Sequence, residues 1–306
     1  MSEIATLLTA NTQLLWAAIV AAVVSAIVSY LFRRSEIRLL AKVEYECDQR
    51  KKLRELIGCH HGGLLRAANT MNYRLWNLYQ NHAQGWLDVK GEYANPDRYY
   101  FRTFVYRFLN VCSLVRRLEA EAVHLDARIA RKEDFVFLNY AAALHWVMTD
   151  VALCKGLSYN DFYETDRFFS DRLRRCCDFC LRPEGFVKSG EFDDLLKQAS
   201  NGGETILDSA LRYFDGLSRA EVRFRWDRLV AFHLSLLTFI NSLGCRRQYT
   251  AQTKFDEVAR QNRNPTVLAN LEAWLPRHDL RSDGEAKRIV RAIRKTSRTR
   301  VAAIGS

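Results

Sequence analysis

Nineteen consecutive residues near the start of the chain, from Leu14 to Phe32, carry no charged side chain. As a helix they would span about 28 Å at 1.5 Å per residue, which matches the roughly 30 Å hydrocarbon core of a bilayer. Trp16 and Tyr30 lie near the two ends, where amphipathic aromatic rings favour the headgroup region. Residues 14–32 are therefore predicted to form a transmembrane helix.

The basic residues around this segment predict its orientation. Arg33, Arg34, Arg38 and Lys42 follow it directly, whereas residues 1–13 contain neither Lys nor Arg. Because basic flanks stay on the cytoplasmic side, we expect a single-pass protein of the cell inner membrane with a short extracytoplasmic N-terminus. A cleaved signal peptide is disfavoured, since it would need a basic start and a small-residue cleavage site.

Small residues recur at every fourth position of the predicted span, at Ala17, Ala21, Ser25 and Ser29. Such a stripe lets two helix backbones approach closely in lipid, which favours self-association into a homo-oligomer. The alternative is that alanine is simply common in membrane helices.

The rest of the chain is poor in residues that break helices, with 14 Gly and 4 Pro among 306 residues. A β-sandwich would need a turn about every 8–12 residues, so long helices are favoured. Hydrophobic residues make up 48% of the chain, enough for a packed core. The predicted fold class is all-α, with one N-terminal transmembrane helix followed by a cytoplasmic multi-helix bundle.

Helical periodicity and charge divide the cytoplasmic part. A juxtamembrane helical stalk is predicted over 33–84, interrupted around Gly58–Gly63, and a helical cytoplasmic domain over 98–275. Residues 281–306 hold eight Lys or Arg and two acidic residues, which predicts a basic C-terminal tail. Apolar stripes predict individual helices at about 98–124, 135–153, 160–181, 191–200, 204–214, 219–243, 253–261 and 265–275, and a basic helix from about 284.

A second uncharged stretch, residues 229–245, raises the question of a second membrane span. It contains His233, Ser235, Thr238 and Asn241, whose polar groups are expensive to place in lipid. A central helix of the cytoplasmic core is therefore favoured.

Motifs of the common hydrolases are missing from the sequence. Walker and dinucleotide-binding glycine patterns, the nucleophile elbow GxSxG and the zinc-protease motif HExxH do not occur. Cys176, Cys177 and Cys180 have the spacing of half a zinc site, but no second pair of ligands follows a zinc pattern. The eight cysteines are interpreted as packed thiols of a reducing compartment, and neither a metal nor a cofactor is predicted.

An arginine and a histidine separated by four residues, Arg228 and His233, resemble the short motif of the HEPN family. Members of that family are small all-α proteins, often dimeric, and many are ribonucleases. The resemblance implies a metal-independent cleavage in which His233 acts as general base or acid on a 2′-hydroxyl and Arg228 holds the phosphate. It covers this pair alone, and Leu229 stands where the family usually has a polar residue.

Two further ionisable residues, His145 and Asp150, fall in the apolar helix predicted at 135–153. Buried ionisable groups need partners, so each is expected to have one. A His–Asp pair would tune the histidine for proton transfer, which makes the two residues catalytic candidates. The alternative is that they only satisfy polar groups between packed helices.

The basic tail offers a binding surface for a polyanion. Its candidate residues for nucleic acid or anionic lipid are Lys287, Arg288, Arg291, Arg294, Lys295 and Arg298. A solvated, disordered tail is the alternative.

Three functions remain open from the sequence. The first is a membrane-anchored cytoplasmic effector or scaffold that self-associates and recruits a protein partner or perturbs the membrane; this architecture is similar to small accessory effectors of bacterial phage-defence loci. The second is a membrane-tethered HEPN-like ribonuclease, and the third is a tethered nucleic-acid-binding module that uses the basic tail.

Overall fold

A computed structural model of the chain describes the backbone of residues 2–123, 130–159, 166–200, 205–280 and 284–304. Within these ranges, the side chains of residues 2–15, 17, 18, 132, 199, 200, 246, 301, 303 and 304 are not described. The chain divides into two compact units, one of residues 1–52 with 126–129 and the other of residues 53–125 with 130–306.

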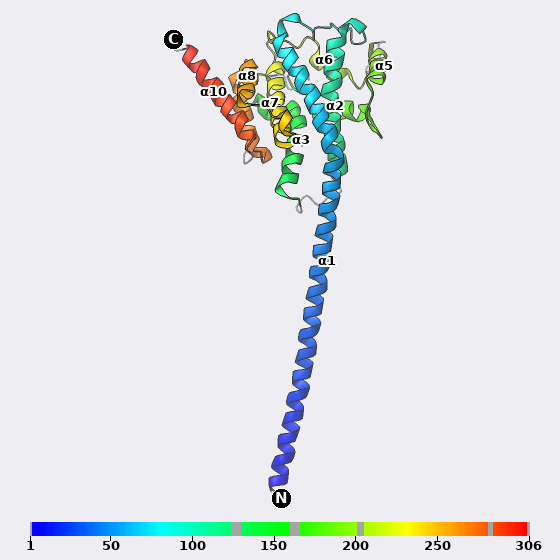
Figure 1. Ribbon diagram of the computed structural model, residues 1–306, viewed down its shortest axis with the longest axis vertical. Helices are drawn as coiled ribbons and strands as arrows, with labels where there is room; N and C mark the ends of the chain where they lie inside the picture. The colour runs from blue at the N-terminus through cyan, green and yellow to red at the C-terminus, as the bar shows by residue number, and fades with distance from the viewer. Residues whose placement is uncertain (1, 124–129, 160–165, 201–204, 281–283, 305–306) are drawn as a thin grey trace. The chain divides into compact units, whose positions relative to one another are not determined.

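The first unit contains the N-terminal part of the long helix α1 (Ser2–Gln80), which runs without interruption through this unit (Figure 1). Every described side chain from Ile19 to Tyr45 is exposed. The large apolar side chains among them range from 47% exposed at Val28 to 75% at Phe32.

The structure describes only some of the side chains of the predicted transmembrane helix. Among the side chains that the structure describes, no helix is both long enough and apolar enough to cross a bilayer. Leu14, Leu15, Ala17 and Ala18 of the predicted span lie outside the described side chains. The transmembrane helix therefore stays a prediction.

The interruption predicted around Gly58–Gly63 is wrong, because α1 continues through all three glycines of that segment. A glycine inside a helix costs about 1 kcal/mol relative to alanine but does not forbid the helical backbone. Directly after this segment, Leu64, Ala67, Ala68 and Met71 are buried at helical spacing, and their packing outweighs the glycine penalty.

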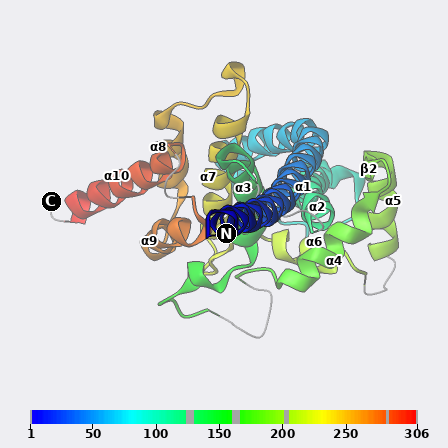
Figure 2. The ribbon, with the colours of Figure 1, turned by 90° about the horizontal axis from the view of Figure 1, so that it is seen from below.

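The second unit is a helical bundle, which confirms the all-α prediction for the described residues. Its most buried helix is α7 (Arg225–Leu243), in which every side chain from Arg225 to Ile240 is buried. Most of residues 229–245, the stretch considered as a second membrane span, therefore lies in a core helix. Helix α3 (Lys132–Thr149) packs along α7 and forms the middle of the bundle with it (Figure 2).

Two groups of helices cover this middle layer from opposite sides (Figures 1 and 2). One group consists of α2 (Tyr99–Ala122), α4 (Ser170–Cys180), α5 (Ser189–Ser200) and α6 (Asp208–Phe214). The other consists of α8 (Gln252–Gln261), α9 (Pro265–Trp274) and α10 (Ala286–Ile304). Short 3-10 helices lie between successive α-helices of the chain, at His82–Gln84, Pro96–Arg98, Val151–Cys154, Arg246–Gln248 and Leu275–His278.

One local departure from the all-α pattern lies after α4. Strands β1 (Leu181–Arg182) and β2 (Gly185–Phe186) form a two-residue antiparallel hairpin, with Leu181 opposite Phe186. Gly185 has a φ of +142°, a conformation that a side chain would strain. The periodicity that predicts helices cannot reveal a hairpin this short.

Candidate functional site

Arg228, the predicted phosphate ligand, is 1% exposed, and buried acceptors surround its guanidinium group. Its Nη1 donates to the carbonyl oxygens of Val147 at 2.8 Å and Asp150 at 2.9 Å. Its Nε donates to the carbonyl oxygen of Asp166 at 3.0 Å, and its Nη2 lies 3.0 Å from Sγ of Cys154. The last carbonyls of a helix lack partners within the helix, so Arg228 caps the C-terminal end of α3.

His233, its predicted partner, is fully buried and faces α1. Its Nε2 lies 2.7 Å from Oδ1 of Asn72 and donates to it in the neutral tautomer that carries the proton there. The rings of Trp76 and Tyr79 lie 5.2 and 5.4 Å from the imidazole, centroid to centroid. Burial lowers the pKa of His233 to about 3, so the ring is neutral at physiological pH.

The fold does not bring Arg228 and His233 to a common site. Five positions apart on α7, they are separated by about 140° around the helix axis. Arg228 faces the end of α3, whereas His233 faces α1. Neither side chain reaches the surface of the described chain.

His145 and Asp150 are not paired with each other either. Oδ2 of Asp150 accepts a hydrogen bond from Nε1 of Trp274 at 2.8 Å and lies 3.8 Å from Nε2 of His278. Both ring nitrogens of His145 are buried without a hydrogen-bond partner among the described residues. Burial, and after it the charges of Arg174 and Arg116, lower the pKa of His145 to about 4.

The three clustered cysteines of α4 are packed thiols. Cys176, Cys177 and Cys180 are all buried, and Sγ of Cys176 donates to the carbonyl oxygen of Ile206 at 2.9 Å. Burial raises the pKa of Cys180. Within the described ranges, no group of three or more His, Cys, Asp or Glu side chains is arranged to hold a metal ion.

The predicted basic tail forms helix α10 from Ala286 onward, while residues 281–283 lie outside the described part. Its apolar face, which includes Ile289, Ala292 and Ile293, is buried. Two cations on the other side are paired, Arg294 with Glu272 and Lys295 with Asp256, at 2.8 and 2.6 Å. A further cation, Arg288, pairs with Glu285 at 2.7 Å and lies 4.9 Å from the ring centroid of Tyr249.

Three other cations of α10, Lys287, Arg291 and Arg298, are exposed. Among the described residues, none of them forms an ion pair or a side-chain hydrogen bond. Their spacing of four and seven positions places them on one face of the helix. This face is a compact group of available positive charge, hereafter the α10 cation face.

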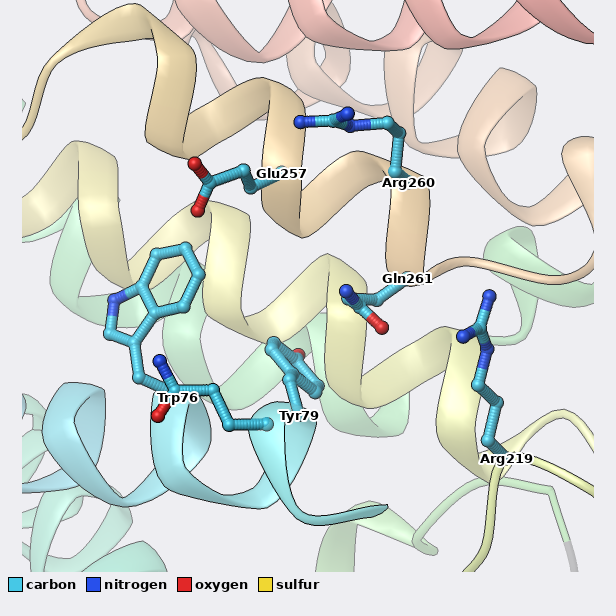
Figure 3. Close-up of a pocket in the computed structure, with 7 residues that line it drawn as sticks. Trp76, Tyr79, Arg219, Glu257, Arg260 and Gln261 are labelled. Carbon is cyan, nitrogen blue, oxygen red and sulfur yellow. The ribbon is translucent and has the colours of Figure 1, made fainter. Parts of the chain in front are cut away.

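The second unit also contains a pocket that no sequence pattern predicts, shown in Figure 3. It has a volume of about 420 Å³ and is formed by the end of α1, the segment before α7 and helix α8. Its lining residues are Trp76, Tyr79, Gln80, Arg219, Glu257, Arg260 and Gln261.

Local helix geometry explains how the pocket acquires its aromatic wall. Trp76 and Tyr79 are three positions apart on α1, so they lie on one side of that helix. Their rings meet edge to face, with centroids 6.4 Å apart. Tyr79 is also held against Trp226 of α7, at 5.5 Å between ring centroids. The pair could be seen in the sequence, but its partners on α8 lie some 180 positions further along the chain.

The charges around the pocket are unequally satisfied. Glu257 pairs with Lys254 at 2.7 Å, and the Lys254 ammonium lies 4.9 Å from the ring centroid of Trp76. Arg260 donates from Nε to the carbonyl oxygen of Asp256 at 3.3 Å and forms no ion pair among the described residues, although its charge helps to lower the pKa of the Asp256 carboxyl. Arg219 likewise forms no ion pair there.

A polar group inside the pocket wall also lacks a partner. The hydroxyl of Tyr79 is buried and has no hydrogen-bond partner among the described residues. Burial, and after it the charge of Asp227, raise the pKa of Tyr79 well above its usual value, so the hydroxyl keeps its proton. It can therefore donate or accept a hydrogen bond.

No protein-family model, curated protein or solved structure matches this chain.

Proposed function

We propose that this chain is a membrane-anchored helical scaffold or effector, in which residues 14–32 insert into the bilayer of the inner membrane. The supporting observation is the uncharged run of nineteen residues, whose described apolar side chains are all exposed. Large contiguous apolar surface is rarely left to water in a soluble protein, and it marks a site that contacts lipid or another protein. In this proposal, lipid covers these side chains.

The orientation follows from the basic residues after the span. Arg33, Arg34, Arg38 and Lys42 are exposed. They would remain on the cytoplasmic side, with the helical bundle. The bundle then recruits a protein partner to the membrane or perturbs the bilayer.

The anchor is tested by fractionating cells that express the full chain and extracting the membranes with alkaline carbonate. We expect wild type to stay in the carbonate-resistant pellet, and Val23→Arg with Val24→Arg to move to the supernatant. An arginine near the centre of a span costs about 2.5–3.5 kcal/mol on insertion scales. The matched control is Ile37→Arg with Leu40→Arg, at exposed positions after the predicted span. Wild type in the soluble fraction would refute the anchor.

Self-association is proposed to use the small-residue stripe that includes Ala21, Ser25 and Ser29. Replacing these three residues with leucine would hold the helix backbones apart, so the detergent-solubilised protein should shift from oligomer to monomer in light scattering. Changing Val20, Val24 and Val28 to leucine keeps the same spacing and serves as the control. Equal oligomer sizes for wild type and both triple variants would count against the stripe.

The extension to bacterial phage defence is proposed on one ground, the similarity of this architecture to small accessory effectors of such loci. Expression of the full chain should then lower the number of phage plaques. The variant with arginines at Val23 and Val24 should restore that number, because the effector would no longer reach the membrane. Equal plaque numbers with and without expression of either protein would reject this extension.

A second function, binding of nucleic acid, is proposed for the α10 cation face, defined by Lys287, Arg291 and Arg298. The three side chains are exposed and have no ion-pair partner among the described residues, so they are available to phosphates. Changing all three to glutamine should lower the affinity for single-stranded RNA and reduce the salt slope of binding by about two, at roughly 0.7 per lost phosphate contact.

The control for this test changes the same net charge elsewhere. Arg66, Lys155 and Lys188 are exposed in the second unit and can be replaced by glutamine together. An equal loss of RNA binding in both triple variants would reject the α10 cation face as the site. Retained RNA binding with lost binding to phosphatidylserine vesicles would reject nucleic acid in favour of a lipid surface.

The HEPN-like ribonuclease stays an alternative prediction. It would require Arg228 and His233 to reach a substrate, and in the described chain both are buried and face different helices. The membrane-anchored scaffold needs no such rearrangement, so we favour it.

A further inference from the structure

The pocket beside Trp76 has the size of a small-molecule site. Its volume of about 420 Å³ lies in the range of roughly 300–1,000 Å³ that is usual for ligand pockets. All of its lining residues belong to the second unit, and they come from three separate segments of the chain. A site assembled from distant segments is held in place by the packing of the bundle.

The charge of the pocket selects an anion. Arg219 and Arg260 line it from two different segments, and neither forms an ion pair among the described residues. The lining holds one acid, Glu257, against these two arginines, so its charge stays positive whether or not Lys254 remains paired with Glu257. Guanidinium groups bind phosphate through several parallel hydrogen bonds, so two of them at one site favour a phosphorylated ligand.

The aromatic wall selects a planar group. Trp76 and Tyr79 line the side of the pocket across from Arg260 (Figure 3). The Lys254 ammonium above the indole shows that a face of Trp76 is open to a group from outside the α1 helix. Lys254 is itself 51% exposed and can swing away. A planar base could take its place and stack on the indole, a contact that is favourable for any base.

Two side-chain amides at the pocket can form hydrogen bonds with the edge of such a base. Gln80 and Gln261 present side-chain amides at the pocket, each with donors and an acceptor.

We propose that this pocket binds a nucleotide, with the base against Trp76 and the phosphate between Arg219 and Arg260. The shared chemistry covers two sources, a free nucleoside phosphate and the terminal nucleotide of a strand. The inference does not rest on the membrane anchor, because every residue that it uses lies in the second unit. It is also separate from the α10 cation face, which contributes no residue to the pocket lining.

The test is isothermal titration of the full-length protein in detergent with AMP, ATP, adenosine, inorganic pyrophosphate and the trinucleotide ApApA. We expect AMP or ATP to bind at least tenfold more tightly than adenosine, which lacks the phosphate, and than pyrophosphate, which lacks the base. Tighter binding of ApApA than of AMP would support the same site with a strand end as its source.

Variants locate the binding. Arg219→Gln and Arg260→Gln should each weaken nucleotide binding at least tenfold, and Trp76→Leu should remove the preference for AMP over pyrophosphate. The control is Arg277→Gln, an exposed arginine outside the pocket lining. Circular dichroism checks that each variant is folded, and the two arginine variants keep the test decisive should Trp76→Leu unfold. No nucleotide binding at millimolar concentration, equal binding of pyrophosphate, or unchanged binding in both arginine variants would overturn the proposal.

Discussion

Nη1 of Arg228 on α7 lies 2.8 Å from the carbonyl oxygen of Val147 in the last turn of α3. The same guanidinium group also reaches the carbonyl oxygens of Asp150 and Asp166. One side chain thus joins the end of α3, the 3-10 helix that follows it and the segment before α4. The residue that resembles a catalytic arginine in the sequence instead binds three backbone carbonyl oxygens and the sulfur of Cys154.

Replacement of Arg228 by methionine should therefore destabilise the bundle strongly. It removes a charged donor from buried acceptors, and hydrogen bonds of this kind contribute about 1.5–3 kcal/mol each. We expect a loss of at least about 3 kcal/mol, measured as a lower midpoint of thermal unfolding by circular dichroism. Arg66→Met, at an exposed position, is the control and should leave the midpoint unchanged. A folded Arg228→Met protein that had lost an RNA-cleaving activity would instead support the catalytic assignment.

Periodicity along the chain was enough to predict most helices. Apolar residues at helical spacing predict 98–124, and α2 spans Tyr99–Ala122; a run without charge predicts a buried helix, and α7 is buried through Ile240. Such signals lie within a short stretch of sequence, so they can be recognised without knowledge of the tertiary fold. The prediction of a break at Gly58–Gly63 is wrong because it considered only the low helix propensity of glycine. It did not include the packing of the residues that follow.

Candidate sites were harder to predict, because side-chain direction depends on distant partners. The sequence singled out His145 and Asp150, but the partner of Asp150 is Trp274, 124 positions away. The pocket was missed for the same reason, since Trp76 and Arg260 meet only once α8 has packed near the end of α1. Residue types carried the chemical signal, and only the tertiary fold decides which of them share a site.

The three glycines in the middle of α1 offer a stabilising substitution. A methyl group added at Gly58, Gly62 or Gly63 would meet nothing within 4 Å. Alanine is favoured over glycine by up to about 1 kcal/mol inside a helix, so each change should stabilise the protein by roughly 0.5–1 kcal/mol. The measurement is the thermal unfolding midpoint of the triple alanine variant.

Gly244 provides the contrast for this prediction. A Cβ there would lie 2.4 Å from the carbonyl oxygen of Ile240, so Gly244→Ala should lower the unfolding midpoint. If the triple variant of α1 is also destabilised, then the glycines serve a bend or a close contact that this structure does not contain.

His145 is predicted to be replaceable with a gain in stability. Both of its ring nitrogens are buried without a partner among the described residues, and each such group costs roughly 1–3 kcal/mol. His145→Leu removes them at similar volume, so the free energy of unfolding at pH 7 should rise by about 1 kcal/mol or more. His233→Leu should do the opposite, because it leaves Asn72 without its 2.7 Å hydrogen bond. Destabilisation by His145→Leu would show that its ring has a partner or a function.

His233 should make the stability of the protein depend on pH in the acid range. Its folded pKa of about 3 lies below the ordinary value of 6.5, so the unfolded chain binds the proton first as the pH falls. Stability is therefore complete above about pH 6.5 and decreases from there toward pH 3. At pH 5 the loss from this one group is about 2 kcal/mol, from 1.36 kcal/mol per pKa unit.

His233→Gln keeps an amide donor for Asn72 but cannot titrate, so the fall in unfolding free energy between pH 7 and pH 5 should shrink by about that amount. The exposed His82, changed to glutamine, is the control and should leave the fall as it is in wild type. An identical pH dependence in wild type and His233→Gln would mean that the imidazole is reached by water in the folded protein, and its burial against Trp76 and Tyr79 would have to be revised.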